Sequence, residues 1–247
     1  MSAGVERHLF PELVESNVIL TNSSGVHRIP ISEMAMAMML YFAKSLDKFV
    51  RLQLQRRWSR IIPDELAGKT AGIPGLGNVG METAYRAKCF GMRVIALKRR
   101  PMRRPTYVDE ILGPEDIERL LRESDFLIVT VPLTGETYHM IGERELKLMK
   151  PTAYIINVSR GAVIDNGALL KALKEGWIAG AGLDVFEEEP LPEDSELWEL
   201  ENILITPHIS GGTPYYADRV IDIFCENLKR YLTGRPIINV VDKRAGY

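Results

Sequence analysis

Three residues with charged or titratable side chains each follow a short apolar run in this sequence: Arg160, Glu189 and His208. The runs that precede them span 153–158, 179–184 and 203–207. Apolar runs of this length predict buried strands. In an open parallel sheet, ligands bind at the carboxyl ends of the strands. The sequence therefore predicts a cation, a carboxylate and an imidazole together at one edge of a sheet.

These residue types suit the reduction of a 2-keto acid, which needs a hydride on carbon and a proton on oxygen. The planar guanidinium of Arg160 can bind a carboxylate or a keto oxygen. His208 can donate the proton, Glu189 beside it favours the charged imidazole, and neutral His208 is the base in the oxidative direction. Asp184, at the end of its strand, could contact the carboxamide of a nicotinamide. Singly, each residue also fits a surface ion pair, an acidic turn or a helix cap, and only their joint placement favours a site. The other histidines lack such neighbours and are expected to be structural or exposed: His8, His27 and His139.

A glycine-rich turn, Gly75-Leu76-Gly77-Asn78-Val79-Gly80, follows a predicted strand and opens a predicted helix. Glycines at this spacing allow a tight turn, close approach of a pyrophosphate and close packing of helix on strand. The helix N-terminus adds free N–H groups and a partial positive charge. The motif alone is weak evidence, but in its strand–turn–helix context it indicates a dinucleotide site.

The next predicted strand, 92–97, is followed by Lys98, Arg99 and Arg100, where an NAD site would have an Asp or Glu for the ribose 2′-hydroxyl. No acid appears until Asp109. Guanidinium groups bind a phosphate well, so the sequence favours NADP over NAD. A solvated basic loop would give the same pattern.

Helical and strand patterns alternate from 71 to 207, which predicts an α/β fold with a Rossmann-type doubly wound parallel sheet. A long helix is expected over 32–58, with a methionine stripe that indicates core or dimer contacts. A helix over 214–232 and a short strand over 237–240 are expected to follow the series. Within the series we expect strands at 71–73, 92–97, 126–131, 153–158, 178–184 and 202–206, and helices at 81–90, 114–122, 143–149 and 167–175.

The composition is that of a soluble globular protein, with 247 residues, 46% hydrophobic and 26% charged. A net charge of −2 gives no electrostatic case for nucleic acid or an anionic membrane. The longest apolar stretch, 34–43, is shorter than the roughly 20 residues that a spanning helix needs, and the N-terminus has no apolar signal region. Cys89 and Cys225 form neither a disulfide framework nor a metal-ligand spacing. We expect no metal, and two buried free thiols in a reducing cytoplasm.

Three segments closely resemble signatures of the D-isomer-specific 2-hydroxyacid dehydrogenases: 158–161, 182–190 and 206–211. The turn at 75–80 and the segment 131–134 resemble the cofactor segments of that family, and the match is collinear over nearly the whole chain. The resemblance implies an NAD(P)-binding Rossmann domain over 30–213. It implies that 1–29 and 214–247 are the remnant of a flavodoxin-like substrate-binding lobe, of which family members carry a further N-terminal segment.

The resemblance also implies an NAD(P)-dependent oxidoreductase that acts on a small 2-keto or 2-hydroxy acid, with glyoxylate or hydroxypyruvate indicated. Arg160 would bind the substrate, His208 would be the acid/base, and Glu189 its partner. Segment 2–5 resembles a loop whose backbone N–H groups hold the substrate carboxylate, which assigns Ala3, Gly4 and Val5 to substrate binding. The residues expected to bind the cofactor are Gly75, Leu76, Gly77, Asn78, Val79, Gly80, Lys98, Arg99, Arg100, Val131, Pro132, Thr137, Val158, Ser159, Asp184, His208 and Gly211.

Family members are usually homodimers, so the resemblance implies a homodimer with the helix over 32–58 near the contact. Two other functions stay open. One is a catalytically inactive NAD(P)-binding remnant or a corepressor-like interaction module, because the fold permits it. The other is an enzyme acting on a phosphorylated hydroxy acid.

Overall fold

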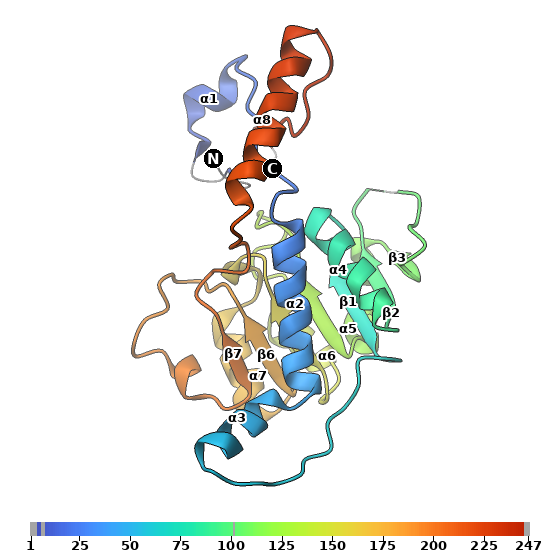
Figure 1. Cartoon of the computed structure of the whole chain (residues 1–247), viewed down its shortest axis with the longest axis vertical. Coiled ribbons are helices and arrows are strands. Elements are labelled where there is room, and N and C mark those ends of the chain that lie inside the picture. The colour runs from blue at the N-terminus through green and yellow to red at the C-terminus, as the bar shows by residue number, and fades with distance from the viewer. Residues whose placement is uncertain (1–3, 6–7, 101, 245–247) are drawn as a thin grey trace. The chain divides into compact units, whose positions relative to one another are not determined.

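The computed structural model describes residues 4–5, 8–100 and 102–244 of the chain. The chain divides into two compact units (Figure 1). The larger unit is Ile31–Ser210, and the smaller unit combines Met1–Pro30 with Gly211–Tyr247.

The larger unit is built on a seven-stranded sheet in the order β3-β2-β1-β4-β5-β6-β7. All neighbouring strands are parallel. The direction of strand progression reverses between β1 and β4, which makes the sheet doubly wound and confirms the predicted fold class. Of the seven strands of this sheet, β3 is the one that was not predicted from the sequence. The strands are β1 (Thr70–Pro74), β2 (Arg93–Leu97), β3 (Glu110–Leu112), β4 (Phe126–Val129), β5 (Tyr154–Asn157), β6 (Gly180–Leu183) and β7 (Ile203–Ile205).

Helices cover both faces of this sheet. α2 (Arg28–Ala43), from Ile31 onward, and α4 (Asn78–Cys89) pack on one face. α5 (Ile117–Glu123), α6 (Glu143–Leu148) and α7 (Asn166–Glu175) pack on the other (Figure 1). Among the described residues, none of the helices combines the length and apolar character needed to cross a membrane.

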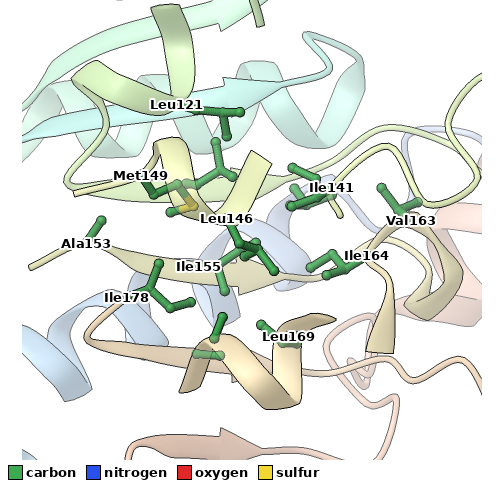
Figure 2. Packing of buried hydrophobic residues seen from close by; sticks show 14 of the residues in the cluster. Leu121, Ile141, Leu146, Met149, Ala153, Ile155, Val163, Ile164, Leu169 and Ile178 are labelled. Atoms are coloured by element: carbon green, nitrogen blue, oxygen red, sulfur yellow. The ribbon is translucent and has the colours of Figure 1, made fainter. Parts of the chain in front are cut away.

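The two buried clusters follow from the pleat of the strands. In β2, Val94 and Ala96 belong to the cluster under α2 and α4, whereas Ile95 and Leu97 belong to the cluster under α5 to α7. Successive side chains of a strand point to opposite faces, so a strand covered on both faces reads as a continuous apolar run. Figure 2 shows the second cluster, in which Leu121, Leu146 and Leu169 come from the three helices and Ile155 from β5.

The prediction of one long helix over 32–58 is wrong, because two helices occupy this range: α2 and α3 (Leu46–Leu54). Ser45 between them has φ 52°, in the left-handed region that breaks a helix. The end of α2 is held by a returning segment of chain. The Ala43 carbonyl accepts the Asp64 N–H at 2.8 Å, and Lys44 Nζ donates to the Asp64 carbonyl at 2.9 Å. Met36, Met38 and Met39 of α2 are buried, and Met34 is partly buried against the same cluster, which is the core contact that the sequence offered beside a dimer contact.

The smaller unit contains α1 (Pro11–Glu15) and α8 (Tyr216–Leu232). The predicted strand over 237–240 is wrong, since among the described residues this segment forms a single antiparallel bridge, between Thr21 and Val240. Asn239 has φ 55°, and its Nδ2 donates to the Ser24 carbonyl at 2.8 Å. The chain turns there instead of continuing a ladder. That this unit is part of a substrate-binding lobe stays a prediction.

The two cysteines are free, as expected, but they are exposed and not buried. Cys89 is the last residue of α4, whose buried positions include Ala84 and Ala87. Cys89 lies two residues after the buried Ala87, which is a rotation of about 200° around the helix axis. Its side chain therefore points away from the core. Cys225 has the same offset from the buried Asn227 on α8.

Candidate active site

The glycine-rich turn connects β1 to α4. Gly75 has φ 104°, and a Cβ there would lie 2.8 Å from the backbone nitrogen of Val131. A Cβ on Gly80 would lie 2.1 Å from the Gly75 carbonyl oxygen. Gly77 precedes the first turn of α4, and a Cβ there would meet nothing within 4 Å. Gly75 and Gly80 therefore give the turn its shape, while Gly77 leaves open space at a helix N-terminus. This geometry fits the pyrophosphate of a dinucleotide.

Thr130, which sequence reasoning missed, supports this turn from the end of β4. Its hydroxyl donates to the Gly75 carbonyl at 2.7 Å, and its N–H donates to the Pro74 carbonyl at 3.2 Å. The segment 131–137, which carries predicted cofactor residues, is held by hydrogen bonds within itself. Thr137 Oγ1 donates to the Pro132 carbonyl at 2.6 Å and accepts the Thr134 N–H at 2.8 Å. The Thr137 side chain therefore shapes the segment after β4.

The basic segment lies beside the glycine turn. Lys98 Nζ donates to the Leu76 carbonyl at 2.8 Å, which places a positive charge at the turn. Arg99 and Arg100 are exposed, and Arg99 pairs with Glu136 at 2.9 Å. The predicted cofactor residues Leu76 and Val158 are themselves buried.

Asp109, the first acid after β2, is hydrogen-bonded to the N-terminal end of that strand. Its carboxylate accepts the Val94 N–H at 2.8 Å and bonds to Lys88 Nζ at 2.7 Å. Partial burial acts to raise the pKa of Asp109, but the hydrogen bonds from Lys88 and Val94 outweigh it, and the pKa is lowered. Asp109 therefore stands at the start of β2, away from the end that precedes the basic segment.

Arg160 follows β5 in a turn held by Asn157, the last residue of that strand. Asn157 Oδ1 accepts from the Ser159 N–H at 3.1 Å and from the Ser159 hydroxyl at 3.0 Å. Asn157 Nδ2 donates to the Arg160 carbonyl at 3.0 Å. Arg160 Nη1 donates to the Ser159 carbonyl at 2.8 Å. Asn157 could have been noticed as a polar residue inside an apolar run.

Glu189 and His208 are in direct contact. Nδ1 of His208 lies 2.7 Å from Oε2 of Glu189. The other carboxylate oxygen of Glu189 accepts the Phe186 N–H at 3.0 Å. A carboxylate against Nδ1 assigns the hydrogen to that nitrogen and leaves Nε2 for chemistry. The His208 side chain is 47% exposed, so a ligand can reach it.

Asp184 organises the loop that carries His208. Its buried carboxylate accepts the Thr206 hydroxyl at 2.5 Å, the Ile209 N–H at 2.9 Å and the Ser210 N–H at 2.9 Å. His208, with φ 50°, sits between these anchors. The nicotinamide contact of Asp184 stays a prediction. The structure shows that its carboxylate holds the loop around His208.

Backbone contacts join the three loops at the strand ends. The Asp184 N–H donates to the Asn157 carbonyl at 3.0 Å, and the His208 N–H donates to the Asp184 carbonyl at 2.8 Å. A Cβ on Gly161 would lie 1.8 Å from the carbonyl carbon of Phe186, so the loops after β5 and β6 are also in close contact. The loops that carry the predicted catalytic residues thus form one assembly at the carboxyl edge of β5, β6 and β7.

The prediction that His139 lacks acidic neighbours is wrong. Its Nε2 lies 2.9 Å from Glu187 Oε1, and its Nδ1 lies 3.6 Å from Asp165 Oδ2. These residues are far apart in sequence, so no local pattern could reveal the cluster. His8 is exposed, and His27 stacks on Tyr216, as expected of structural or surface histidines.

The other predicted ligand-binding residues belong to the smaller unit. Ala3 lies outside the described residues. Gly4 is half-buried, and Val5 is buried with its carbonyl accepting the His8 N–H at 2.8 Å. The Gly211 carbonyl lies 3.1 Å from Nδ1 of His27.

Comparison with known proteins gives a consistent result. The sequence model of a family described as "D-isomer specific 2-hydroxyacid dehydrogenase, NAD binding domain" matches residues 36–210. The glyoxylate reductase of Thermococcus litoralis is 45% identical over 243 residues, covering 94% of this chain and 72% of the relative. The glyoxylate reductase of Pyrococcus furiosus is 42% identical over 246 residues, covering 94% and 71%.

Two solved structures extend the comparison. A D-isomer specific 2-hydroxyacid dehydrogenase from Xanthobacter autotrophicus Py2, in complex with NADPH and MES, has a TM-score of 0.89 and 33% identity, covering 99% of this chain and 100% of that chain. An NADPH-dependent glyoxylate/hydroxypyruvate reductase from Sinorhizobium meliloti, in complex with NADP and sulfate, has a TM-score of 0.89 and 29% identity, covering 100% and 78%.

Proposed function

The chain belongs to the D-isomer-specific 2-hydroxyacid dehydrogenases and is an NAD(P)-dependent oxidoreductase, and we propose that it reduces glyoxylate or hydroxypyruvate with NADPH. The predicted family and the predicted use of NAD(P) are thereby confirmed. The names of the relatives support the proposed substrates. The observation that carries the proposed chemistry is the contact of Glu189 with His208 at the carboxyl edge of the sheet.

The proposed site assigns one task to each side chain. When bound, the reduced nicotinamide cofactor supplies the hydride for C2 of the keto acid. The guanidinium of Arg160 binds the substrate carboxylate and keto oxygen. His208 donates the proton from Nε2 to the keto oxygen, while Glu189 holds Nδ1 and orients the ring. One hydride on C2 and one proton on oxygen convert the carbonyl group to the alcohol, and in the reverse direction neutral Nε2 accepts the hydroxyl proton.

We propose that the cofactor pyrophosphate binds at the turn from Gly75 to Gly80 and the N-terminus of α4. The open space at Gly77 supports this placement. The 2′-phosphate of NADPH would bind at Lys98, Arg99 and Arg100. Lys98 already donates to the Leu76 carbonyl, but an ammonium group has three hydrogens and keeps two for a phosphate.

The remaining cofactor assignments follow the family resemblance. They place Val131, Pro132 and Thr137 after β4, Val158 and Ser159 after β5, Asp184 after β6, and Gly211 after β7. The substrate lobe is likewise proposed from the resemblance, with residues 1–29 and 214–247 in the lobe and 30–213 in the cofactor domain. Gly4 and Val5 would then bind the substrate carboxylate through backbone N–H groups. A Gly4→Pro variant lacks that N–H and should raise KM.

We propose a homodimer whose contact includes α3 and the segment after it. Several large apolar side chains are exposed there: Leu46, Val50, Leu54, Trp58 and Ile62. Exposed apolar patches mark interaction surfaces. Light scattering should find a dimer that a Val50→Asp/Leu54→Asp variant converts to a monomer, and a monomeric wild type would refute the proposal.

We also propose a cytoplasmic location. Cys89 and Cys225 are free and exposed, which suits a compartment that keeps thiols reduced. Cell fractionation tests this, and recovery of the protein outside the cytoplasm would overturn it.

A His208→Ala variant tests the proposed reaction. Loss of a general acid typically costs about 10²–10⁴-fold in rate, so kcat for glyoxylate should fall by that order. The dissociation constant of NADPH, measured by fluorescence, serves as the control and should change far less than kcat, because most of the proposed cofactor contacts lie at the glycine turn and the basic segment. Undiminished turnover would refute the assignment of His208. Cofactor binding by a wild-type protein without turnover would favour the interaction-module alternative.

A further inference from the structure

Asn157 is a buried polar residue at the end of an otherwise apolar strand. The residue is only 1% exposed. An amide buried without hydrogen-bond partners is destabilising, so the identity of its partners shows what this position does. Among the described residues, its side-chain hydrogen bonds go to Ser159 and Arg160.

The amide of Asn157 holds both ends of this dipeptide. Oδ1 accepts the Ser159 N–H and hydroxyl, at the start of the dipeptide. Nδ2 donates to the Arg160 carbonyl, at its end. An Asn side chain that bonds the backbone two residues ahead makes an Asx turn. Here Nδ2 of the amide is hydrogen-bonded as well, so the turn cannot change its conformation without breaking a hydrogen bond.

The strand gives this clamp a rigid base. Asn157 is paired with Leu183 of β6, and its carbonyl accepts the Asp184 N–H at 3.0 Å. Sites on strands are held more precisely than sites on loops. The clamp also reaches the guanidinium of Arg160, because Nη1 donates to the carbonyl of the clamped Ser159.

From these contacts we infer that Asn157 is a positioning residue that sets the substrate-binding geometry of Arg160 without touching the substrate. The inference rests on the proposed role of Arg160 in substrate binding. A bidentate contact between a guanidinium and a carboxylate depends on the direction of the planar fork. A misplacement of about 1 Å can cost about 10²-fold, so loosening the turn should weaken substrate binding.

An Asn157→Asp variant keeps the shape and the Oδ1 acceptor but places an oxygen against the Arg160 carbonyl. KM for glyoxylate should rise at least about tenfold, with smaller changes in kcat and in the dissociation constant of NADPH. The matched control is Asn202→Asp, because Asn202 Nδ2 also donates to a backbone carbonyl, that of Leu173 at 3.2 Å, outside the site. The control should leave KM unchanged. If Asn157→Asp fails to fold, Asn157→Ser adds no buried charge and should give the same rise in KM.

A double-mutant cycle separates positioning from general damage. The readout is the dissociation constant of oxamate, a keto-acid analogue, from the NADPH complex, which does not require turnover. Asn157→Asp (or Asn157→Ser) and Arg160→Ala should each weaken oxamate binding, and the double variant should bind it no more weakly than Arg160→Ala. Additive losses, or unchanged affinity in the Asn157 variant, would overturn the inference. Unchanged affinity in Arg160→Ala would instead refute the proposed role of Arg160.

Discussion

Oε2 of Glu189 lies 2.7 Å from Nδ1 of His208, while Oε1 of the same carboxylate accepts the Phe186 N–H at 3.0 Å. The two oxygens have different partners, so turning the carboxylate would break a bond to its own loop. Glu189 is therefore held in one orientation against the ring. This arrangement fixes which nitrogen of His208 remains available for proton transfer.

Replacing Glu189 by Gln should lower kcat for glyoxylate about 10²-fold or more. The amide keeps the shape of the side chain but removes the carboxylate that accepts from Nδ1 of His208 and orients the ring. Steady-state kinetics checks this, with Glu188→Gln, at the exposed neighbouring position, as the control. Equal kinetics for the two variants would show that Glu189 does not serve His208.

Weakening the anchors of Asp184 should lower kcat without a comparable loss of NADPH affinity. Thr206→Val removes one hydrogen bond, whereas Asp184→Asn turns one acceptor oxygen into a donor that faces backbone or hydroxyl donors. A buried donor left without an acceptor costs about 1–3 kcal/mol, so Asp184→Asn should be the more damaging change in both thermal stability and kcat. If NADPH affinity falls as steeply as kcat in Asp184→Asn while Thr206→Val is silent, the carboxylate acts mainly on the cofactor.

Removing the arginines after β2 should reduce the preference for NADPH over NADH. The double variant Arg99→Ala/Arg100→Ala should weaken NADPH about tenfold or more, since a charge-assisted hydrogen bond contributes about 1.5–3 kcal/mol. NADH affinity should change little. Arg144→Ala, at an exposed arginine elsewhere in the unit, is the control. Tighter binding of NADH than of NADPH by the wild-type protein would defeat this prediction.

Asp109 should affect stability and not cofactor choice. Its pKa is lowered in the folded protein, so it contributes stability above its unfolded pKa of about 3.9, and that contribution is lost as the pH falls through the lower folded value. Asp109→Asn should therefore lower the melting temperature at pH near 7, by the equivalent of about 1 kcal/mol, and the difference should close below about pH 4. Thermal unfolding over this pH range checks it. A changed ratio of NADPH to NADH affinity in this variant would mean that Asp109 acts at the ribose.

Local patterns in the sequence were enough to predict the alternation of strands and helices, the glycine turn and the three residues proposed for catalysis. Strand and helix periodicities are properties of neighbouring residues, and a parallel sheet brings its carboxyl ends to one edge regardless of the side chains elsewhere. The fold class and the segments after β5, β6 and β7 could therefore be placed without coordinates. The break at Ser45 could not, because it depends on a contact between the end of α2 and Asp64.

The tertiary structure alone decided what holds the proposed site together. The bonds of Asp184 to the loop around His208, and the cluster of His139 with Asp165 and Glu187, join residues that are distant in the sequence. The exposure of Cys89 likewise depends on which side of α4 meets the sheet. Such contacts follow from the packing of whole elements. The sequence by itself thus determined which residues could do the chemistry, and folding determined which neighbours orient them, because orientation comes from hydrogen bonds between loops that only the assembled sheet brings together.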